Sequence, residues 1–382
     1  MTYLEYKVRA VPRGFKKLFY LNWPIILLLC AAGAIGIIML TSIAGNSWDP
    51  WASAQLKRFF VGLALMISIA MVPIWFWKSM SVLAYITSLG LLVLVEFFGS
   101  TGMGAQRWLD MGFITLQPSE MAKITLIMVL AFYYDWLPEQ LVSKPLWIIA
   151  PLAIIFFPFF LVLQQPDLGT AILIVLGGGA MMFLAGIHWG YFGAALSVSV
   201  GGALTILQSR GKDWQLLNDY QYRRIDTFID PSSDPLGAGY HITQSKIALG
   251  SGGWTGRGFG QGTQSRLNFL PEKHTDFIFT TLAEEFGFIG GISLLAIYAL
   301  IVVFAIIAAI SNKDRFSSLL IYGVTVTFFL YFAVNMAMVM GLAPVVGVPL
   351  PLVSYGGSSL LVLMAAFGLL QSAHVHKPRG VI

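Results

Sequence analysis

The feature that most limits what this chain can fold into is the recurrence of long apolar runs along most of its length. Of its 382 residues, 57% are hydrophobic and only 11% are charged, whereas a soluble domain carries about 25% charged residues. An apolar run of about 20 residues is long enough to cross the hydrocarbon core of a bilayer as a helix. The sequence therefore predicts an all-α polytopic membrane protein and not a large soluble core.

Ten such runs can be counted, several of them short or interrupted by Gly, Pro or a charge. They cover residues 24–44, 59–77, 80–100, 119–135, 146–163, 169–187, 190–207, 287–310, 317–341 and 352–373. The first run is long enough to span and has no obvious small-residue cleavage site, so we interpret it as a retained helix and not as a signal peptide. We expect one domain over residues 1–382.

The distribution of Lys and Arg in short loops predicts the orientation of the spans. With a cytoplasmic N-terminus, the inside segments hold most of the basic residues, namely Lys7, Arg9, Arg13, Lys16, Lys17, Lys78, Lys144, Lys313, Arg315, Lys377 and Arg379. The short outside loops hold only Lys57, Arg58 and Arg107. We therefore expect two cytoplasmic termini and a large extracytoplasmic loop, 208–286, between the seventh and eighth spans.

The net charge of +5 fits contact with anionic lipid headgroups better than contact with nucleic acid. The single cysteine, Cys30, excludes an intrachain disulfide and suggests neither thiol catalysis nor a Cys-based metal site. The loop 208–286 contains a glycine-rich tract, "GSGGWTGRGFGQG". No Gly-Lys-Ser/Thr follows the tract, and no strand–helix unit surrounds it, so it matches neither phosphate-binding fingerprint. Its glycines are expected to permit tight backbone excursions near a bound lipid.

Ionisable residues within apolar surroundings are costly and are therefore candidates for function. In "QPSEMAKI", Glu120 and Lys123 lie three residues apart on one face of a helix start. They form either a self-neutralising pair near the interface or a site where Lys123 meets a substrate phosphate. In "QQPDLGT", Asp167 is either the N-cap of the sixth helix or a carboxylate that orients a partner in a cavity.

Two further segments on the predicted outer face contain candidate substrate-binding or catalytic residues. Arg107 and Trp108 in "AQRWLDMG" combine a planar cation with an apolar stacking face, which suits a diphosphate and a sugar. The stretch "LPEKHTDFIF" gathers Lys273, His274 and Asp276 ahead of the eighth span. Asp276 is either an acidic residue at a helix N-terminus or a carboxylate base tuned by its surroundings. The spacing of His274 and Asp276 is poor for a metal site.

The motifs taken together resemble the SEDS family of cell-wall proteins (shape, elongation, division and sporulation). The resemblance rests on "NFLPEKHTDFIFTTLAEEFGFIGG" and "GLAPVVGVPLPLVSYGGSS", supported by "QPSEMAK", "QPDLGT" and the segment from "DPSSDPLGAGYHITQSKIALG" to "GQGTQS". It extends from about the second span to the C-terminus. Within the family, "PVVGVPLP" resembles the rod-shape members, whereas the division members have a threonine-containing version.

The resemblance implies a peptidoglycan glycosyltransferase of the bacterial inner membrane that polymerises lipid II into β-1,4 glycan outside the membrane during elongation. It implies that Asp276 is the essential acidic residue, and it places Arg107, Trp108, Glu120, Lys123, Asp167, Lys273 and His274 in supporting or substrate-binding positions. The partners implied are a class B penicillin-binding protein and other membrane proteins of the elongation complex.

An inverting transfer needs one carboxylate base and help for the leaving diphosphate. Asp276 is the expected base, and Arg107, Lys123 and Lys273 are expected to screen the diphosphate. A divalent cation, Mg²⁺ or Mn²⁺, is an open alternative to these cations, and the sequence indicates no resident metal or other cofactor. Two other functions stay open from the residues alone, namely a lipid II flippase and a scaffold that only holds the transpeptidase.

Overall fold

The structure is a computed structural model of the chain. It describes residues 12, 14–102, 105–110, 112, 115–212, 214–216, 222, 225–227, 229–230, 234, 237–267, 269 and 272–377. The predicted cytoplasmic residues Lys7, Arg9, Arg13 and Arg379 lie outside the described residues, as does part of the turn-rich segment "DPSSDPLGAG".

Helices account for nearly all of the regular structure. The long ones are α1 (Trp23–Ile43), α2 (Trp51–Met71), α3 (Ile74–Phe98), α4 (Pro118–Trp136), α5 (Pro145–Gln164), α6 (Leu168–Leu184), α7 (Trp189–Ser209), α11 (Ile278–Ile310), α12 (Arg315–Val339) and α13 (Ser358–Val375). Among the described residues, eight helices are long and apolar enough to cross a membrane. This confirms a polytopic, mostly helical membrane protein, while the count of ten spans stays a prediction.

The smaller elements lie between or before the long helices. The first is a 3₁₀ helix, η1 (Gly14–Tyr20), and another, η2 (Glu139–Leu141), follows α4. The predicted large loop contains α9 (Ala238–Ser251) and α10 (Thr263–Arg266). Between α3 and α4, the short strands β1 (Ser100–Gly102), β2 (Ala105–Asp110) and β3 (Thr115–Leu116) form an antiparallel sheet in the order β1-β2-β3. The sequence did not predict this sheet.

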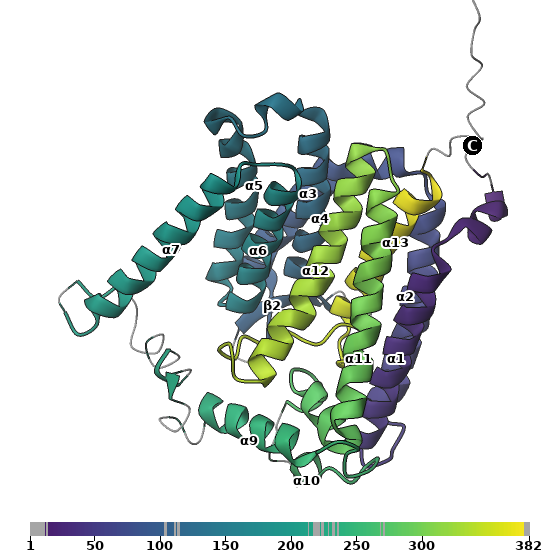
Figure 1. Ribbon diagram of the computed structural model, residues 1–382, viewed down its shortest axis with the longest axis vertical. Coiled ribbons are helices and arrows are strands. Elements are labelled where there is room, and N and C mark those ends of the chain that lie inside the picture. The colour runs from purple at the N-terminus through teal and green to yellow at the C-terminus, as the bar shows by residue number, and fades with distance from the viewer. Residues whose placement is uncertain are drawn as a thin grey trace, which may run out of the picture.

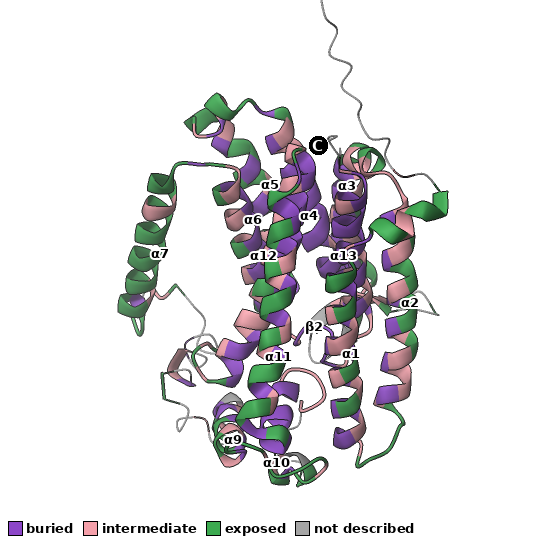
Figure 2. Cartoon of the chain, turned by 45° about the vertical axis from the view of Figure 1, so that its right-hand side comes forward, coloured by how far each residue is buried: buried purple, intermediate pink, exposed green. Residues whose placement is uncertain are grey.

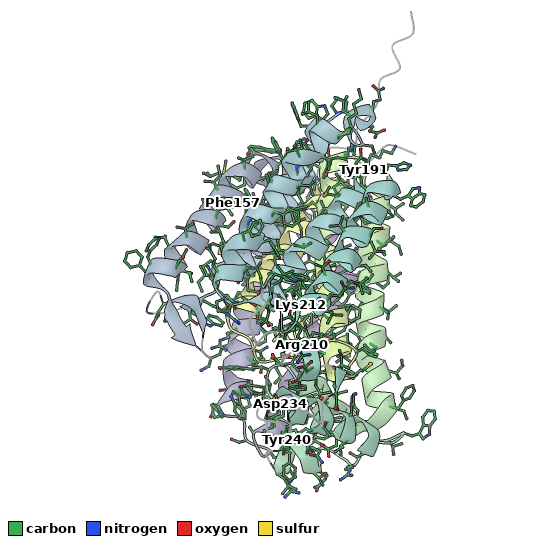
Figure 3. All side chains as sticks on the ribbon, turned by 90° about the vertical axis from the view of Figure 1, so that its left-hand side faces the viewer. Phe157, Tyr191, Arg210, Lys212, Asp234 and Tyr240 are labelled. Atoms are coloured by element: carbon green, nitrogen blue, oxygen red, sulfur yellow. The ribbon has the colours of Figure 1, made fainter. Side chains whose placement is uncertain are left out.

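The helices pack into one bundle in which α4 is the most enclosed and α7 the least. Most of α4 is buried, whereas α7 is exposed along nearly its whole length (Figure 2). Figure 1 shows α7 inclined away from the bundle, with η1 and the end of α13 at one end of the molecule and α9 and α10 at the other. Figure 3 shows Arg210 and Lys212, just after α7, between the level of Tyr191 and that of Tyr240.

The predicted boundary between the second and third spans was wrong. The apolar runs were divided after residue 77, but α2 ends at Met71 and α3 begins at Ile74, with Pro73 as its N-cap. Proline has no backbone N–H and cannot continue a helix, so the break falls there. The start of α2 also differs, since the helix begins at Trp51 and not at residue 59. Lys57 and Arg58 therefore lie on this helix and not in a loop.

The eighth predicted span began at residue 287, whereas α11 begins at Ile278. Gly287 interrupts it with φ 66° and ψ −161°, a backbone conformation open essentially only to glycine. The glycine-rich tract packs against this kink, because Arg257 N donates to Glu284 O (3.0 Å) and Phe288 N donates to Gly253 O (2.9 Å). The tract therefore contacts α11 on both sides of this kink.

The last predicted span began at residue 352, but α13 begins only at Ser358. The preceding segment, 344–357, is irregular, and Leu352 has a positive φ of 66°. Two glycines, Gly356 and Gly357, directly precede the helix. This non-helical approach to α13 lies within the bundle and, as described below, contacts the residues ahead of α11.

We predict that Gly287→Ala destabilises the protein. A Cβ at this position would lie 2.4 Å from the backbone N of Gly256, and the φ angle is strained for any L residue. Such strain costs about 1–3 kcal/mol, so the midpoint of thermal unfolding in detergent should fall. The matched control is Gly90→Ala on the exposed face of α3, where a Cβ meets no atom within 4 Å. Equal midpoints for the two variants would contradict this account.

Candidate active site

The segment directly ahead of α11 is held by the irregular segment ahead of α13. Tyr355 N donates to His274 O (2.9 Å), and Ser354 Oγ donates to Thr275 O (2.5 Å). Leu350 N in turn donates to Ser354 Oγ (2.8 Å). Ser354 therefore joins both segments, and the backbone on either side of Asp276 has little freedom to shift.

Asp276 is anchored through its own backbone as well. Asn335 Nδ2 of α12 donates to Asp276 O (2.9 Å) and to Val348 O (2.7 Å). The Asp276 side chain is partly buried and faces Gly347, where a Cβ would lie 3.6 Å from its Oδ2. No side chain forms a capping hydrogen bond at the start of α11, so Asp276 does not act as its N-cap.

Burial, and to a lesser extent the negative charge of Glu272, together raise the pKa of Asp276 from 3.8 to about 6. Removal of a carboxylate from water disfavours its charged form. A carboxyl group with a pKa near 6 is still mostly ionised at neutral pH, but it binds a proton more readily than an ordinary aspartate. This combination suits a general base.

The other two predicted residues of this segment, His274 and Lys273, do not share the properties of a general base. The His274 ring stacks on Trp51 at 5.0 Å between centroids and lies 6.1 Å from the Tyr355 ring. Burial lowers the pKa of His274 and of Lys273. His274 therefore serves mainly as a neutral aromatic surface between α2 and the approach to α13.

Glu120 and Lys123 form a buried ion pair on α4, with Lys123 Nζ 2.7 Å from Glu120 Oε1. Their side chains are 7% and 4% exposed, and the Tyr331 hydroxyl of α12 hydrogen bonds to both. The adjoining cavity, lined by Glu120, Tyr331, Leu350 and Ser354 among others, has a volume of about 30 Å³. That is room for water and not for a sugar. In this conformation the pair neutralises itself.

Asp167 is the N-cap of α6, one of the two alternatives predicted for it. Thr170 N donates to its Oδ1 (3.2 Å) and Thr170 Oγ1 to its Oδ2 (2.9 Å). It also accepts a hydrogen bond from the side-chain amide nitrogen Nε2 of Gln117 (3.2 Å). Arg107 Nη1 lies 3.8 Å from Asp167 Oδ1, and its Nε donates to Gln165 O (3.2 Å). Asp167 thus both caps a helix and partners a cation.

Trp108 follows Arg107 on β2 and pairs with Ser100 of β1. The structure therefore brings the predicted residues together in three groups, namely Arg107 with Asp167, Glu120 with Lys123, and the segment from Lys273 to Asp276. Tyr331 and Asn335 connect the last two groups, since they lie four residues apart on one face of α12. Sequence reasoning missed both residues, although two polar side chains at helical spacing in an apolar span are a signal.

Within the described part of the chain, no three His, Cys, Asp or Glu side chains lie together in a group that could hold a metal ion. An all-protein metal cage at the candidate site is therefore not supported by the described residues. Mg²⁺ is often held by one or two carboxylates together with substrate phosphates, so the participation of a divalent cation stays a prediction.

Comparison with known proteins places the chain in a family. The family profile for FtsW, RodA and SpoVE, described as cell cycle protein, matches residues 21–379. The chain is 42% identical to the peptidoglycan glycosyltransferase MrdB of Escherichia coli K12, over 94% of each chain. It is 36% identical to the probable peptidoglycan glycosyltransferase FtsW of Pseudoalteromonas atlantica, over 91% of this chain and 71% of that protein.

Solved structures share the fold. The rod shape determining protein RodA of Thermus thermophilus matches with a TM-score of 0.69 and 26% identity, over 93% of this chain and 96% of that one. A chain from a peptidoglycan synthase complex, described as coordinating polymerization and crosslinking, matches with a TM-score of 0.79 and 29% identity over 93% and 97%. Both solved structures thus match 93% of this chain.

The buried pair on α4 gives a testable prediction. Glu120→Gln or Lys123→Met alone should destabilise the protein by about 3–5 kcal/mol, because each leaves one buried charge without its partner. The double variant should recover a large part of that loss. Unfolding in detergent, analysed as a double-mutant cycle, measures the coupling. The control cycle is Lys78–Asp135, a pair with 36% and 18% exposed side chains, where about 1 kcal/mol or less is expected. Additive effects at Glu120 and Lys123 would rule out the coupling.

Proposed function

This chain belongs to the FtsW, RodA and SpoVE family and is a multi-pass membrane protein and a peptidoglycan glycosyltransferase; from that premise we propose how it works. It joins lipid II units into β-1,4 glycan strands, with Asp276 as the general base. The observation that carries this proposal is a carboxyl group with a pKa of about 6 on a backbone held by α12 and by the approach to α13.

The reaction needs a base because the acceptor is a sugar hydroxyl, whose pKa lies far above neutrality. Asp276 takes the hydroxyl proton as the oxygen attacks the anomeric carbon of the donor, and the polyprenyl diphosphate leaves from the opposite face. An α-linked donor becomes a β-linked product, so the transfer inverts the configuration and one carboxylate suffices. General base catalysis of this kind contributes about 10²–10⁴-fold to the rate.

The other predicted residues take substrate-binding roles in this proposal. Trp108 offers a flat face to a sugar, and His274, whose ring stacks on Trp51, borders the sugar with the edge of its ring. Lys273 lies three residues before the base in the sequence. Arg107 and Lys123 already have carboxylate partners in Asp167 and Glu120. Their charges are therefore largely balanced, and they are better suited to orient the site than to carry the whole charge of a diphosphate.

We further propose ten transmembrane helices with both termini in the cytoplasm, and an extracytoplasmic loop, 208–286, that joins the seventh and eighth helices. The positive-inside distribution supports this orientation, as does the position of η1 and the end of α13 at the end of the bundle opposite α9 and α10 (Figure 1). The synthase complex among the structural relatives supports a class B penicillin-binding protein as partner, together with other elongation proteins of the inner membrane.

We predict that Asp276→Asn reduces glycan polymerisation by about 10²–10⁴-fold, since the amide cannot accept the proton. The assay uses purified protein, with and without its partner, and labelled lipid II in detergent, where a flippase or scaffold would yield no chains. The control is Asp110→Asn, an exposed carboxylate on β2, which should polymerise at nearly the wild-type rate. Full polymerase activity in Asp276→Asn would remove Asp276 from the mechanism.

The pKa of Asp276 also predicts the pH dependence. Because the base must be ionised, kcat/KM should fall as the pH drops through about 6, by about tenfold per pH unit below that value. The Glu272 carboxylate raises the pKa of Asp276, so Glu272→Gln should move this acid limb to lower pH while activity at neutral pH is kept. An acid limb at the same pH in both proteins would show that another group controls it.

A further inference from the structure

Arg58 is an unbalanced cation at the start of α13. It extends from α2, which runs beside α13 (Figure 1), and its guanidinium carbon lies 4.9 Å from the centre of the Tyr355 ring. A Cβ at Gly357, the N-cap of α13, would lie 3.7 Å from that carbon. The guanidinium therefore rests against the first turn of an 18-residue helix.

This position is electrostatically unfavourable without an anion. A helix N-terminus carries about half a positive charge, so it attracts carboxylates and phosphates and repels a guanidinium. Among the described residues, no carboxylate lies within 4 Å of Arg58, and its buried Nη1 has no hydrogen-bond partner. The other cations of the site differ, since Arg107 and Lys123 each have an acidic partner.

The helix start itself is also unsatisfied. No side chain caps α13. Ser358 is only 2% exposed, yet its Oγ is buried without a hydrogen-bond partner. Buried polar groups are normally paired, and exceptions call for a ligand, an ion or water. Two independent groups, one from α2 and one from α13, thus lack a partner at the same place.

An anion can reach this place, and it would lie close to the proposed base. Gly356, Gly357 and Ser359 are partly exposed, and the two glycines leave the backbone open to close approach. The neighbouring residues Ser354 and Tyr355 are those that hold the backbone of Thr275 and His274. The same short segment therefore connects the unbalanced cation with Asp276.

We propose that Arg58, the first-turn amides of α13 and the Ser358 hydroxyl bind the diphosphate of a polyprenyl diphosphate-linked substrate. The inference rests on the proposed function for the identity of this anion. A guanidinium offers two parallel N–H donors to phosphate oxygens, and free amides at a helix start are a common phosphate site. Binding there would stabilise the charge that develops on the leaving diphosphate as the glycosidic bond breaks.

The test is direct binding of undecaprenyl diphosphate to the full chain in nanodiscs, with undecaprenol as the probe that lacks phosphate. Arg58→Ala should weaken diphosphate binding by about tenfold to a hundredfold and leave undecaprenol binding unchanged. Arg58→Lys should weaken it less, because it keeps the charge. The matched control is Lys57→Ala, which removes the same charge from the adjacent, exposed position of α2 and should bind as the wild type does.

Unchanged diphosphate affinity in Arg58→Ala would overturn the proposal. So would a loss of undecaprenol binding as large as the loss of diphosphate binding, or an equal loss of thermal stability in Arg58→Ala and Arg58→Lys. Nanodiscs with and without phosphatidylglycerol separate a diphosphate site from a general phospholipid site, since displacement by phosphatidylglycerol at equal concentration would refute the former. Asp276→Asn should keep diphosphate affinity. If the wild type bound the diphosphate through Arg58 but made no glycan, the proposed function would fail and this site would stand.

Discussion

The structure depends on hydrogen bonds between two non-helical segments, one ahead of α11 and one ahead of α13, that lie within a bundle of apolar helices. Unpaired backbone groups in such surroundings cost several kcal/mol, so irregular chain is tolerated only where other protein groups pair it. The carbonyl oxygens of His274, Thr275 and Asp276 accept hydrogen bonds from Tyr355, Ser354 and Asn335. This pairing keeps an irregular, polar segment at the start of α11 and fixes the place of the Asp276 carboxylate.

The charges of the site divide into balanced pairs and groups without a partner. Glu120 with Lys123 and Asp167 with Arg107 are balanced, which limits the cost of burying them. Asp276, with its raised pKa, and Arg58, without a carboxylate, are not. A charged group without a partner gains more free energy from binding a proton or an anion than a paired group does. For this reason we propose Asp276 as the base and Arg58 as a diphosphate ligand.

Much of the fold was predictable from local pattern, and each wrong boundary has an identifiable physical cause. Each predicted span overlaps a long helix, because hydrophobic length is a property of the sequence alone. Apolar character continues past Pro73, so the length of the apolar run does not mark this boundary, whereas the missing N–H of proline does. The start of α11 at Ile278 could not be predicted from apolar length, since Glu284 and Glu285 look like surface residues. In the folded chain they are buried and accept hydrogen bonds from Thr263, Gln264 and Ser42.

The sequence by itself determined the membrane class, the overlap of each apolar run with a helix and the family, since each follows from composition or from ordered motifs. Only the tertiary structure decided which charges are balanced, because Arg107 meets Asp167 across 60 residues and Tyr331 reaches Glu120 from another helix. It also decided that Arg58 rests on the start of α13. Such contacts between distant segments have no signature in local sequence, because packing of the whole bundle brings them together.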